Sequence, residues 1–298
     1  MTPIRPSSLL RAAAQRLAPR LPWLYDLKDA WLASRTRAFA VERAARDTLE
    51  RLRLVPDGSL HPRLGAYGRK IHSQNDEDGV LAYLFSRLAP AQPSGERFFV
   101  EIGVGPPLRP GRGDASSAVA DPTLLECNSL ALKRRGWRGL FLDGHAYPPE
   151  LGVTQAFVTA ENINELLAKH GAPPRFDLFS LDIDGNDYWV WRALRAEPTV
   201  VVVEYNASLG PRESKTIPYD PSFDWSANGC TQFYGASLLA LTRLGAEKGY
   251  TLVYANGVNA FFVRSERVPN RDQFRFERLY RHNPAHAPLR GDERWHEV

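Results

Sequence analysis

Four polar side chains follow two segments of the chain that have the pattern of buried strands. Asp182 and Asp184 end one apolar run, and Glu204 and Asn206 end the next. Parallel strands present their carboxyl ends at one edge of a sheet, so these side chains are expected to converge. Hard divalent cations take oxygen ligands, and a bound cation lowers the pKa of a coordinated hydroxyl. The pattern predicts a magnesium site formed by all four residues, with Asp184, Glu204 and Asn206 also placed to act on the reacting group.

Other interpretations of the same residues remain open. Without a metal, Asp184 or Glu204 could act directly as a general base. Residues 184–187 could instead form only a turn with helix capping, with Glu204 paired to an arginine.

A second group of residues suits a cofactor that contains a nucleoside. Glu101, Gly103 and Gly105 follow a predicted strand, and glycines there let a ligand approach the backbone closely. Asp143 ends the next predicted strand, where a carboxylate can accept hydrogen bonds from both hydroxyls of a ribose. Each feature alone also fits an ordinary turn. Leu108 stands where a nicotinamide-dinucleotide fingerprint needs its third glycine, so that class of cofactor is not favoured.

Together with further segments, these residues resemble the class I S-adenosylmethionine-dependent methyltransferases, and within them the FkbM-type group. The resemblance covers roughly residues 73–263. It is carried by residues 99–105, 126–129, 136–144, 160–162 and 180–189, and by the Asn256-Gly257 turn of a C-terminal hairpin. It implies an α/β fold of the three-layer Rossmann-like methyltransferase type, with a mainly parallel sheet and a C-terminal antiparallel hairpin strand.

The resemblance also implies a cofactor, a reaction and contact residues. The cofactor would be S-adenosyl-L-methionine, and the reaction O-methylation of a sugar, glycan or secondary metabolite. Cofactor contacts are implied for Glu101, Gly103 and Gly105 at the methionine part, Asp143 at the ribose, and Glu161 and Asn162 at the adenine; Asp182 is counted with them. A Pro/Gly/Arg-rich insertion at residues 106–122 departs from the family pattern and could form part of the substrate entrance.

Two rival functions fit parts of the pattern. Asp182 and Asp184 form an Asp-x-Asp sequence at a strand end, which nucleotide-sugar glycosyltransferases use to hold a metal and a diphosphate. A methyltransferase-like scaffold whose cofactor cleft has closed, and which has no activity, is the other. The long segment at residues 206–232 carries Tyr219, Phe223 and Trp225, whose rings suit either a sugar-like acceptor or packing within the loop.

Strands that alternate with helices from residue 73 onward would position these groups. Strands are predicted at residues 98–102, 139–143, 154–159, 178–183, 199–205, 251–254 and 258–263. Helices are predicted from Ser73, as the capping residue, to about residue 88, and at residues 123–135, 163–170, 188–194 and 236–248. This alternation is typical of a mainly parallel sheet covered on both faces.

Charge is unevenly distributed along the chain. Residues 1–60 carry a net charge of +5, residues 61–263 carry −3 and residues 264–298 carry +2. We therefore predict a basic helical appendage at residues 1–60, a methyltransferase domain at residues 61–265 and a basic C-terminal tail at residues 266–298.

The same distribution bears on partners and location. The acidic middle part does not favour a nucleic-acid substrate. No run of about 18 uncharged apolar residues occurs, so no membrane span is expected. The appendage could pack on the domain or on a second subunit, or lie on an anionic membrane surface; the oligomeric state does not follow from the sequence. Cys127 and Cys230 are too few for a disulfide framework, which favours a cytoplasmic location.

Overall fold

The computed structural model describes residues 58–105, 125–227, 229, 231–281 and 294–298. Contacts divide the chain into two compact units, residues 1–55 and 56–298, and all described residues belong to the second. Apart from residues 58–60, the predicted appendage lies outside the described residues, as do Cys230 and the insertion at residues 106–122.

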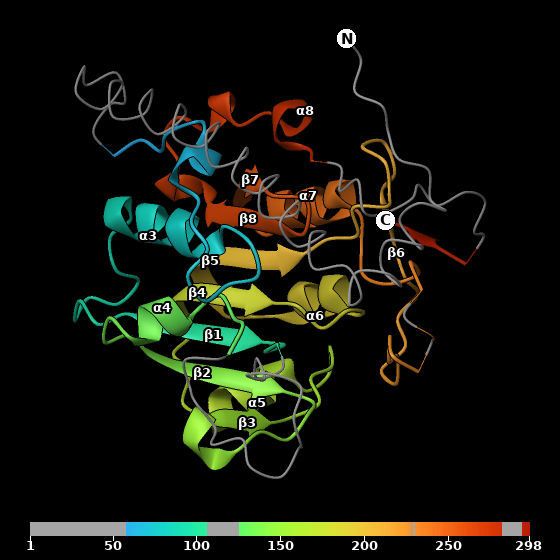
Figure 1. Cartoon of the computed structure of the whole chain (residues 1–298). Helices are drawn as coiled ribbons and strands as arrows, with labels where there is room; N and C mark the ends of the chain where they lie inside the picture. Colours follow the sequence, from blue (N-terminus) through green and yellow to red (C-terminus); the bar gives the residue numbers. More distant parts are fainter. Residues whose placement is uncertain (1–57, 106–124, 228, 230, 282–293) are drawn as a thin grey trace, which may run out of the picture. The chain divides into compact units, whose positions relative to one another are not determined.

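A seven-stranded sheet forms the centre of the described unit, with the strands in the order β3-β2-β1-β4-β5-β8-β7 (Figure 1). Their bounds are β1 Phe98–Ile102, β2 Arg138–Asp143, β3 Val153–Gln155, β4 Arg175–Leu181, β5 Glu197–Glu204, β7 Tyr250–Ala255 and β8 Asn259–Arg264. Strands β1 to β5 pair in parallel, whereas β8 runs antiparallel to both β5 and β7. The predicted α/β class, with a mostly parallel sheet and an antiparallel C-terminal hairpin, is confirmed.

Helices lie on both faces of this sheet (Figure 1). The connections from β1 to β2 and from β4 to β5 run in opposite directions along the sheet. Because both crossovers are right-handed, their helices lie on opposite faces. Neighbouring contacts join α5 to α6 and α6 to α7. The helices are α3 Glu77–Arg87, α4 Leu130–Lys133, α5 Ile163–Lys169, α6 Asp187–Ala193, α7 Leu238–Glu247 and α8 Phe276–Leu279, with short 3₁₀ helices η2 Leu64–Tyr67, η4 Pro149–Leu151, η5 Ser265–Arg267 and η6 Arg271–Gln273.

The middle of the sheet is the most deeply buried part of the fold. Val200, Val201, Val202 and Val203 of β5 are fully buried, because β4 and β8 flank the strand and helices cover its faces. The ring of Trp191 in α6 packs 4.8 Å from the ring of Phe262 in β8. The carboxyl ends of β4 and β5 therefore rest on a rigid frame. No helix among the described residues is both long and apolar enough to cross a bilayer.

Two predicted helix starts are wrong, and buried carboxylates explain both. Helix α3 begins at Glu77 rather than at Ser73, because Asp78 Oδ2 accepts hydrogen bonds from the backbone N–H groups of residues 71–73 and holds them in a turn. The helix predicted from residue 123 begins at Leu130 in the described part of the chain. Residues 125–128 are not helical, and Glu101 binds the backbone at their end.

The predicted strand at residues 154–159 is also too long, since β3 ends at Gln155. The side chain of Asn162 accepts a hydrogen bond from Thr159 N–H at 2.8 Å and donates one to the Phe157 carbonyl at 2.9 Å. These two bonds fold residues 157–162 into a turn.

The described part of the predicted C-terminal tail packs on the domain. Helix α8 contacts β7, and β9, His296–Glu297, pairs antiparallel with β6, Lys215–Thr216, in a second small sheet. Trp295 is buried with Leu209 and Ile217 beside this small sheet.

Candidate active site at the carboxyl edge of the sheet

A cleft of about 1310 Å³ opens at the carboxyl ends of β1, β2, β4 and β5. It lies where the connections from β1 and from β4 leave in opposite directions, the switch point at which open α/β sheets bind ligands. Its walls come from residues 103–105, 143–148, 182–184 and 186, from Gln74 and Asn75 before α3, and from parts of residues 223–234. A space of this size exceeds the usual volume of a single small-ligand pocket.

The backbone after β1 can reach its position only because two residues there lack side chains. Gly103 has φ +82°, and a Cβ at this residue would lie 1.5 Å from the carbonyl oxygen of Asp182. A Cβ at Gly105 would lie 2.8 Å from the carbonyl oxygen of Glu126. The glycines therefore allow the β1 loop to pass directly against its neighbours while it lines the cleft.

Asp143 at the end of β2 holds this loop in place. Its Oδ2 accepts a hydrogen bond from Val104 N–H at 2.8 Å, and its Oδ1 accepts one from His145 N–H at 2.7 Å. The carboxylate is 7 % exposed and lines the cleft. Oδ1 also lies 3.1 Å from Nδ1 of His145, so a ligand hydroxyl would compete with that ring for Oδ1, whereas Oδ2 keeps a second lone pair.

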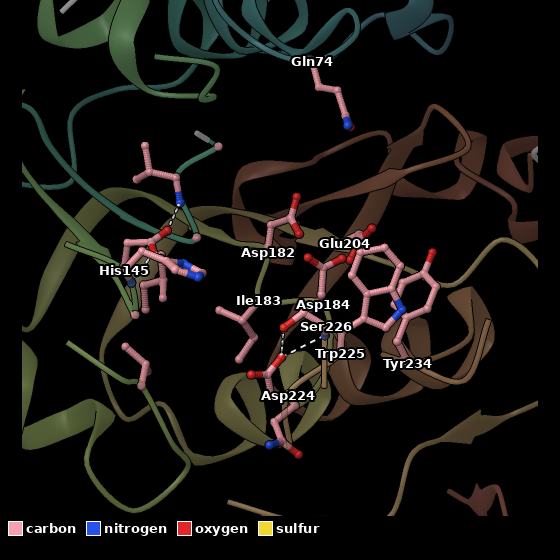
Figure 2. A pocket seen from close by; sticks show the side chains of 18 of the residues that line it. Gln74, His145, Asp182, Ile183, Asp184, Glu204, Asp224, Trp225, Ser226 and Tyr234 are labelled. Atoms are coloured by element: carbon pink, nitrogen blue, oxygen red, sulfur yellow. Dashed lines mark hydrogen bonds and ion pairs between the residues drawn. The ribbon is translucent and has the colours of Figure 1, made fainter. Parts of the chain in front are cut away.

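Three carboxylates converge on the opposite side of the switch point, as Figure 2 shows. One oxygen from each of Asp182, Asp184 and Glu204 lies within 4.8 Å of the other two. Burial, followed by the charge of the neighbouring carboxylates, raises the pKa of both Asp182 and Glu204 well above the ordinary range. Burial also raises the pKa of Asp184. The predicted convergence of these three residues is confirmed.

The loop that carries Asp184 is shaped by a fourth carboxylate. Asp187, fully buried at the start of α6, accepts hydrogen bonds from Ile183 N–H at 3.0 Å and Gly185 N–H at 2.9 Å. Among the described residues, Asp184 is the only non-glycine residue with positive φ, at +52°. Asp187 thus turns the backbone so that the Asp184 side chain lies beside Asp182 and Glu204.

An aromatic loop lies beside the acidic group. A Cβ at Gly185 would lie 2.6 Å from the ring of Phe223, so the loop seats directly on the turn before α6. The rings of Trp225 and Tyr234 lie 5.7 Å apart, beside Glu204 in Figure 2. Trp225 Nε1 donates a hydrogen bond to the Thr231 carbonyl at 2.7 Å, which fixes its ring. The loop offers an aromatic surface next to the carboxylates.

Glu101 and Asn206 do not line the cleft, contrary to the roles expected for them. The buried carboxylate of Glu101 accepts hydrogen bonds from Asn128 N–H at 2.6 Å and Ser129 N–H at 2.7 Å. The amide of Asn206 donates to the carbonyls of Gln232 and Tyr234, and its Oδ1 accepts from Ser208 N–H. Both side chains stabilise loops that form the cleft walls.

Glu161 and Asn162 also lie outside the lining. Glu161 is exposed and accepts a hydrogen bond from the Tyr219 hydroxyl, which lowers the pKa of its carboxyl group. Asn162 forms the turn described above. The neighbouring Phe157 does line the cleft, and its ring is 55 % exposed. Sequence reasoning missed Phe157, because it was assigned to a strand; an apolar side chain just before a predicted cofactor position was the available signal.

The described residues that line the cleft are strongly acidic. They include Glu126, Asp143, Asp182, Asp184, Glu204 and Asp224, whereas His145 is the one basic side chain among them. Such a lining favours ligands whose net charge is zero or positive and disfavours phosphates.

No protein-family model matches this chain, and no curated protein matches its sequence.

Proposed function

We propose that this protein is an S-adenosyl-L-methionine-dependent methyltransferase that methylates an oxygen atom of an uncharged, hydroxylated acceptor such as a sugar, glycan or secondary metabolite. The observation that carries the proposal is the pairing of the loop after β1, with glycine at 103 and 105, with the Asp143 carboxylate at the end of β2. The two lie at the switch point of a mostly parallel sheet. A nucleoside cofactor needs this combination of close backbone approach and a ribose-binding carboxylate.

The remaining cofactor contacts follow from the walls of the cleft. Residues 103–105 would face the methionine part, and Asp143 the ribose. The exposed ring of Phe157 would offer a flat apolar surface to the adenine. The parallel sheet with an antiparallel β8 agrees with the Rossmann-like methyltransferase fold that the resemblance implies.

The acceptor would lie between the cofactor and the aromatic loop. Trp225 and Tyr234 present ring faces beside Glu204 and Asp184, an arrangement that suits a sugar ring with polar edges. The acidic lining disfavours an acceptor that carries phosphate or carboxylate groups.

The reaction requires little of the protein beyond alignment and one proton transfer. The cofactor, when bound, supplies an activated methyl group. The chain would align the acceptor oxygen with it, and Asp184 or Glu204 would take the hydroxyl proton. Burial raises the pKa of both carboxyl groups, and a higher pKa makes a carboxylate a stronger base.

The two rival functions have less support. A nucleotide-sugar glycosyltransferase would bind a diphosphate, yet the described cleft lining holds no lysine or arginine. A scaffold with a closed cleft does not fit an open space of about 1310 Å³.

Calorimetric titration of the full chain with S-adenosylmethionine tests the proposal. We expect saturable binding by the wild type, and binding at least tenfold weaker in Asp143→Asn, because a ribose ligand and the acceptor of a loop N–H are altered together. Asp224→Asn makes the same chemical change on the opposite wall and should bind as the wild type does. Absence of binding by the wild type would remove the proposal. Manganese-dependent binding of a nucleoside diphosphate would then favour the glycosyltransferase.

A further inference from the structure

We propose that Asp182, Asp184 and Glu204 bind one divalent cation of the oxygen-preferring type, Mg²⁺ or Mn²⁺, whose open coordination positions face the acceptor side of the cleft. The site deepens the proposed function, because the cation would hold the acceptor hydroxyl. Cation binding itself does not depend on that function.

Distance is the first support for the site. Each residue offers a carboxylate oxygen within 4.8 Å of the other two. Magnesium binds oxygen at about 2.0–2.1 Å, so ligands on one side of the ion lie about 3 Å apart. Small side-chain rotations would bring the three oxygens to that spacing around one ion.

An unpartnered oxygen is the second and independent support. Glu204 is 9 % exposed, its carboxyl group lies against that of Asp182, and its buried Oε2 receives no hydrogen bond from an N–H or hydroxyl donor. A buried carboxylate oxygen without a partner is costly, since nothing replaces the water that it has lost. Figure 2 shows the Glu204 side chain beside Asp182 and Asp184 at the centre of the cleft. A ligand that accepts electron pairs from all three residues would remove this cost.

The surrounding charge selects a cation as that ligand. The side chains placed around the three carboxylates are Asp187, Gln74, Trp225 and Tyr234. None of these is positively charged, and the described cleft lining holds no lysine or arginine. Three carboxylates within 4.8 Å of one another thus have no lysine or arginine among the described cleft residues to compensate their charge. A divalent ion would supply that compensation.

The position of the site gives the cation a role. All three ligands belong to the ends of β4 and β5 and the turn after β4, so they approach an ion from one wall. Three oxygen ligands leave about half of the six positions of a magnesium ion open. Trp225 and Tyr234, beside which the acceptor is proposed to lie, flank the carboxylates in Figure 2, so an acceptor there could fill the open positions.

Terbium luminescence tests the site directly, because Tb³⁺ binds carboxylate oxygens and Trp225 or Tyr234 would sensitise its emission. The full chain, without added S-adenosylmethionine, would be titrated with Tb³⁺ and the bound ion then competed with Mg²⁺ or Mn²⁺. We expect saturable emission at one ion per chain that both divalent ions displace.

Matched variants locate the ion. Glu204→Gln and Asp184→Asn should each weaken terbium binding at least tenfold. Glu126→Gln removes a cleft carboxylate that pairs with Lys70 at 3.2 Å, outside the group, and should change the affinity less than twofold. Thermal melts establish that each variant is folded, and two independent variants guard against the loss of one.

Three results would overturn the inference: non-saturable emission, failure of Mg²⁺ and Mn²⁺ to compete, or equal losses in Glu126→Gln and Glu204→Gln. Calorimetry with S-adenosylmethionine in the presence of a chelator separates the two proposals. Cofactor binding without a terbium site would overturn only the proposed cation site. A terbium site without cofactor binding would overturn only the proposed methyltransferase function.

Discussion

The side-chain amide of Asn256 donates a hydrogen bond to Glu77 Oε1 at 2.7 Å and so joins the turn of the β7–β8 hairpin to the first residue of α3. The same amide donates to Asp76 at 2.9 Å, and Asn259 donates to Glu77 at 3.0 Å. The residues on either side of this junction, Asn75 and Gly257, both line the cleft. One wall of the cleft thus depends on contacts between the two ends of the domain.

Asn256→Ala should therefore weaken both the fold and cofactor binding. It leaves buried carboxylate oxygens of Glu77 with fewer donors, which we expect to lower the free energy of unfolding by about 2 kcal/mol. Urea denaturation measures that loss, and calorimetry with S-adenosylmethionine measures affinity. Asn164→Ala is the control, since Asn164 also bonds two backbone groups but lies outside the cleft lining. Equal affinities in the two variants would contradict a role for the junction.

Gly103→Ala should be far more damaging than a chemically identical change elsewhere. A methyl group at Gly103 would overlap the Asp182 carbonyl, whereas at Gly95, which has nearly the same φ of +80°, nothing lies within 4 Å. Gly95→Ala should cost about 1 kcal/mol from the left-handed backbone alone. Gly103→Ala should lower the midpoint of thermal unfolding by more than twice the decrease that Gly95→Ala causes. It should also abolish cofactor binding. Similar midpoints in the two variants would show that the loop after β1 is free to move.

Glu101 should make stability depend on pH in an unusual direction. Burial raises the pKa of Glu101 to about 7, from an ordinary value of 4.5. The folded state therefore holds this proton more tightly than the unfolded state does, so the contribution is present below pH 4.5 and is lost as the pH rises through 7. The full effect is about 3 kcal/mol.

The comparison with Glu101→Gln isolates this carboxyl group from other titrating residues. The free energy of unfolding of the wild type, relative to the variant, should fall between pH 4.5 and pH 8. Urea denaturation across this range measures the difference. A constant difference would mean that the hydrogen bonds from Asn128 and Ser129 keep the carboxylate charged in the folded protein.

Asp187→Ala should disturb the acidic group without removing any of its members. The change leaves the N–H groups of Ile183 and Gly185 without their acceptor, at a cost of about 3 kcal/mol in the free energy of unfolding. Because Asp184 lies on the released turn, terbium affinity should also fall, and Asp187→Asn, which keeps one acceptor oxygen, should give an intermediate value. Unchanged terbium affinity in Asp187→Ala would show that the turn does not position Asp184.

Much of the frame could be predicted because local patterns determine it. Residues 200–203 are four consecutive valines, which only a strand covered on both faces accommodates. The Asn256-Gly257 pair marked the hairpin, and the ends of adjacent strands placed Asp182, Asp184 and Glu204 together. In each case the signal lies within a few residues of the feature.

The rest depends on partners that are distant in the sequence. Glu101 bonds the backbone of Asn128 and Ser129, and nothing near Glu101 shows that these N–H groups need an acceptor. Asn206 follows the end of β5, but its amide donates hydrogen bonds to the carbonyls of Gln232 and Tyr234 and does not line the cleft as Glu204 does. A polar residue at a strand end can therefore serve either a ligand or a loop, and only the fold distinguishes the two.

The position of β8 between β5 and β7 has a consequence for biosynthesis. Strand β5 leaves the ribosome before residues 205–258, and only then does β8 arrive to pair with it. Until that moment the four valines of β5 border an open strand edge, which is a template for pairing with other chains. Premature termination before Asn259 should therefore yield an aggregating fragment instead of a shortened folded domain.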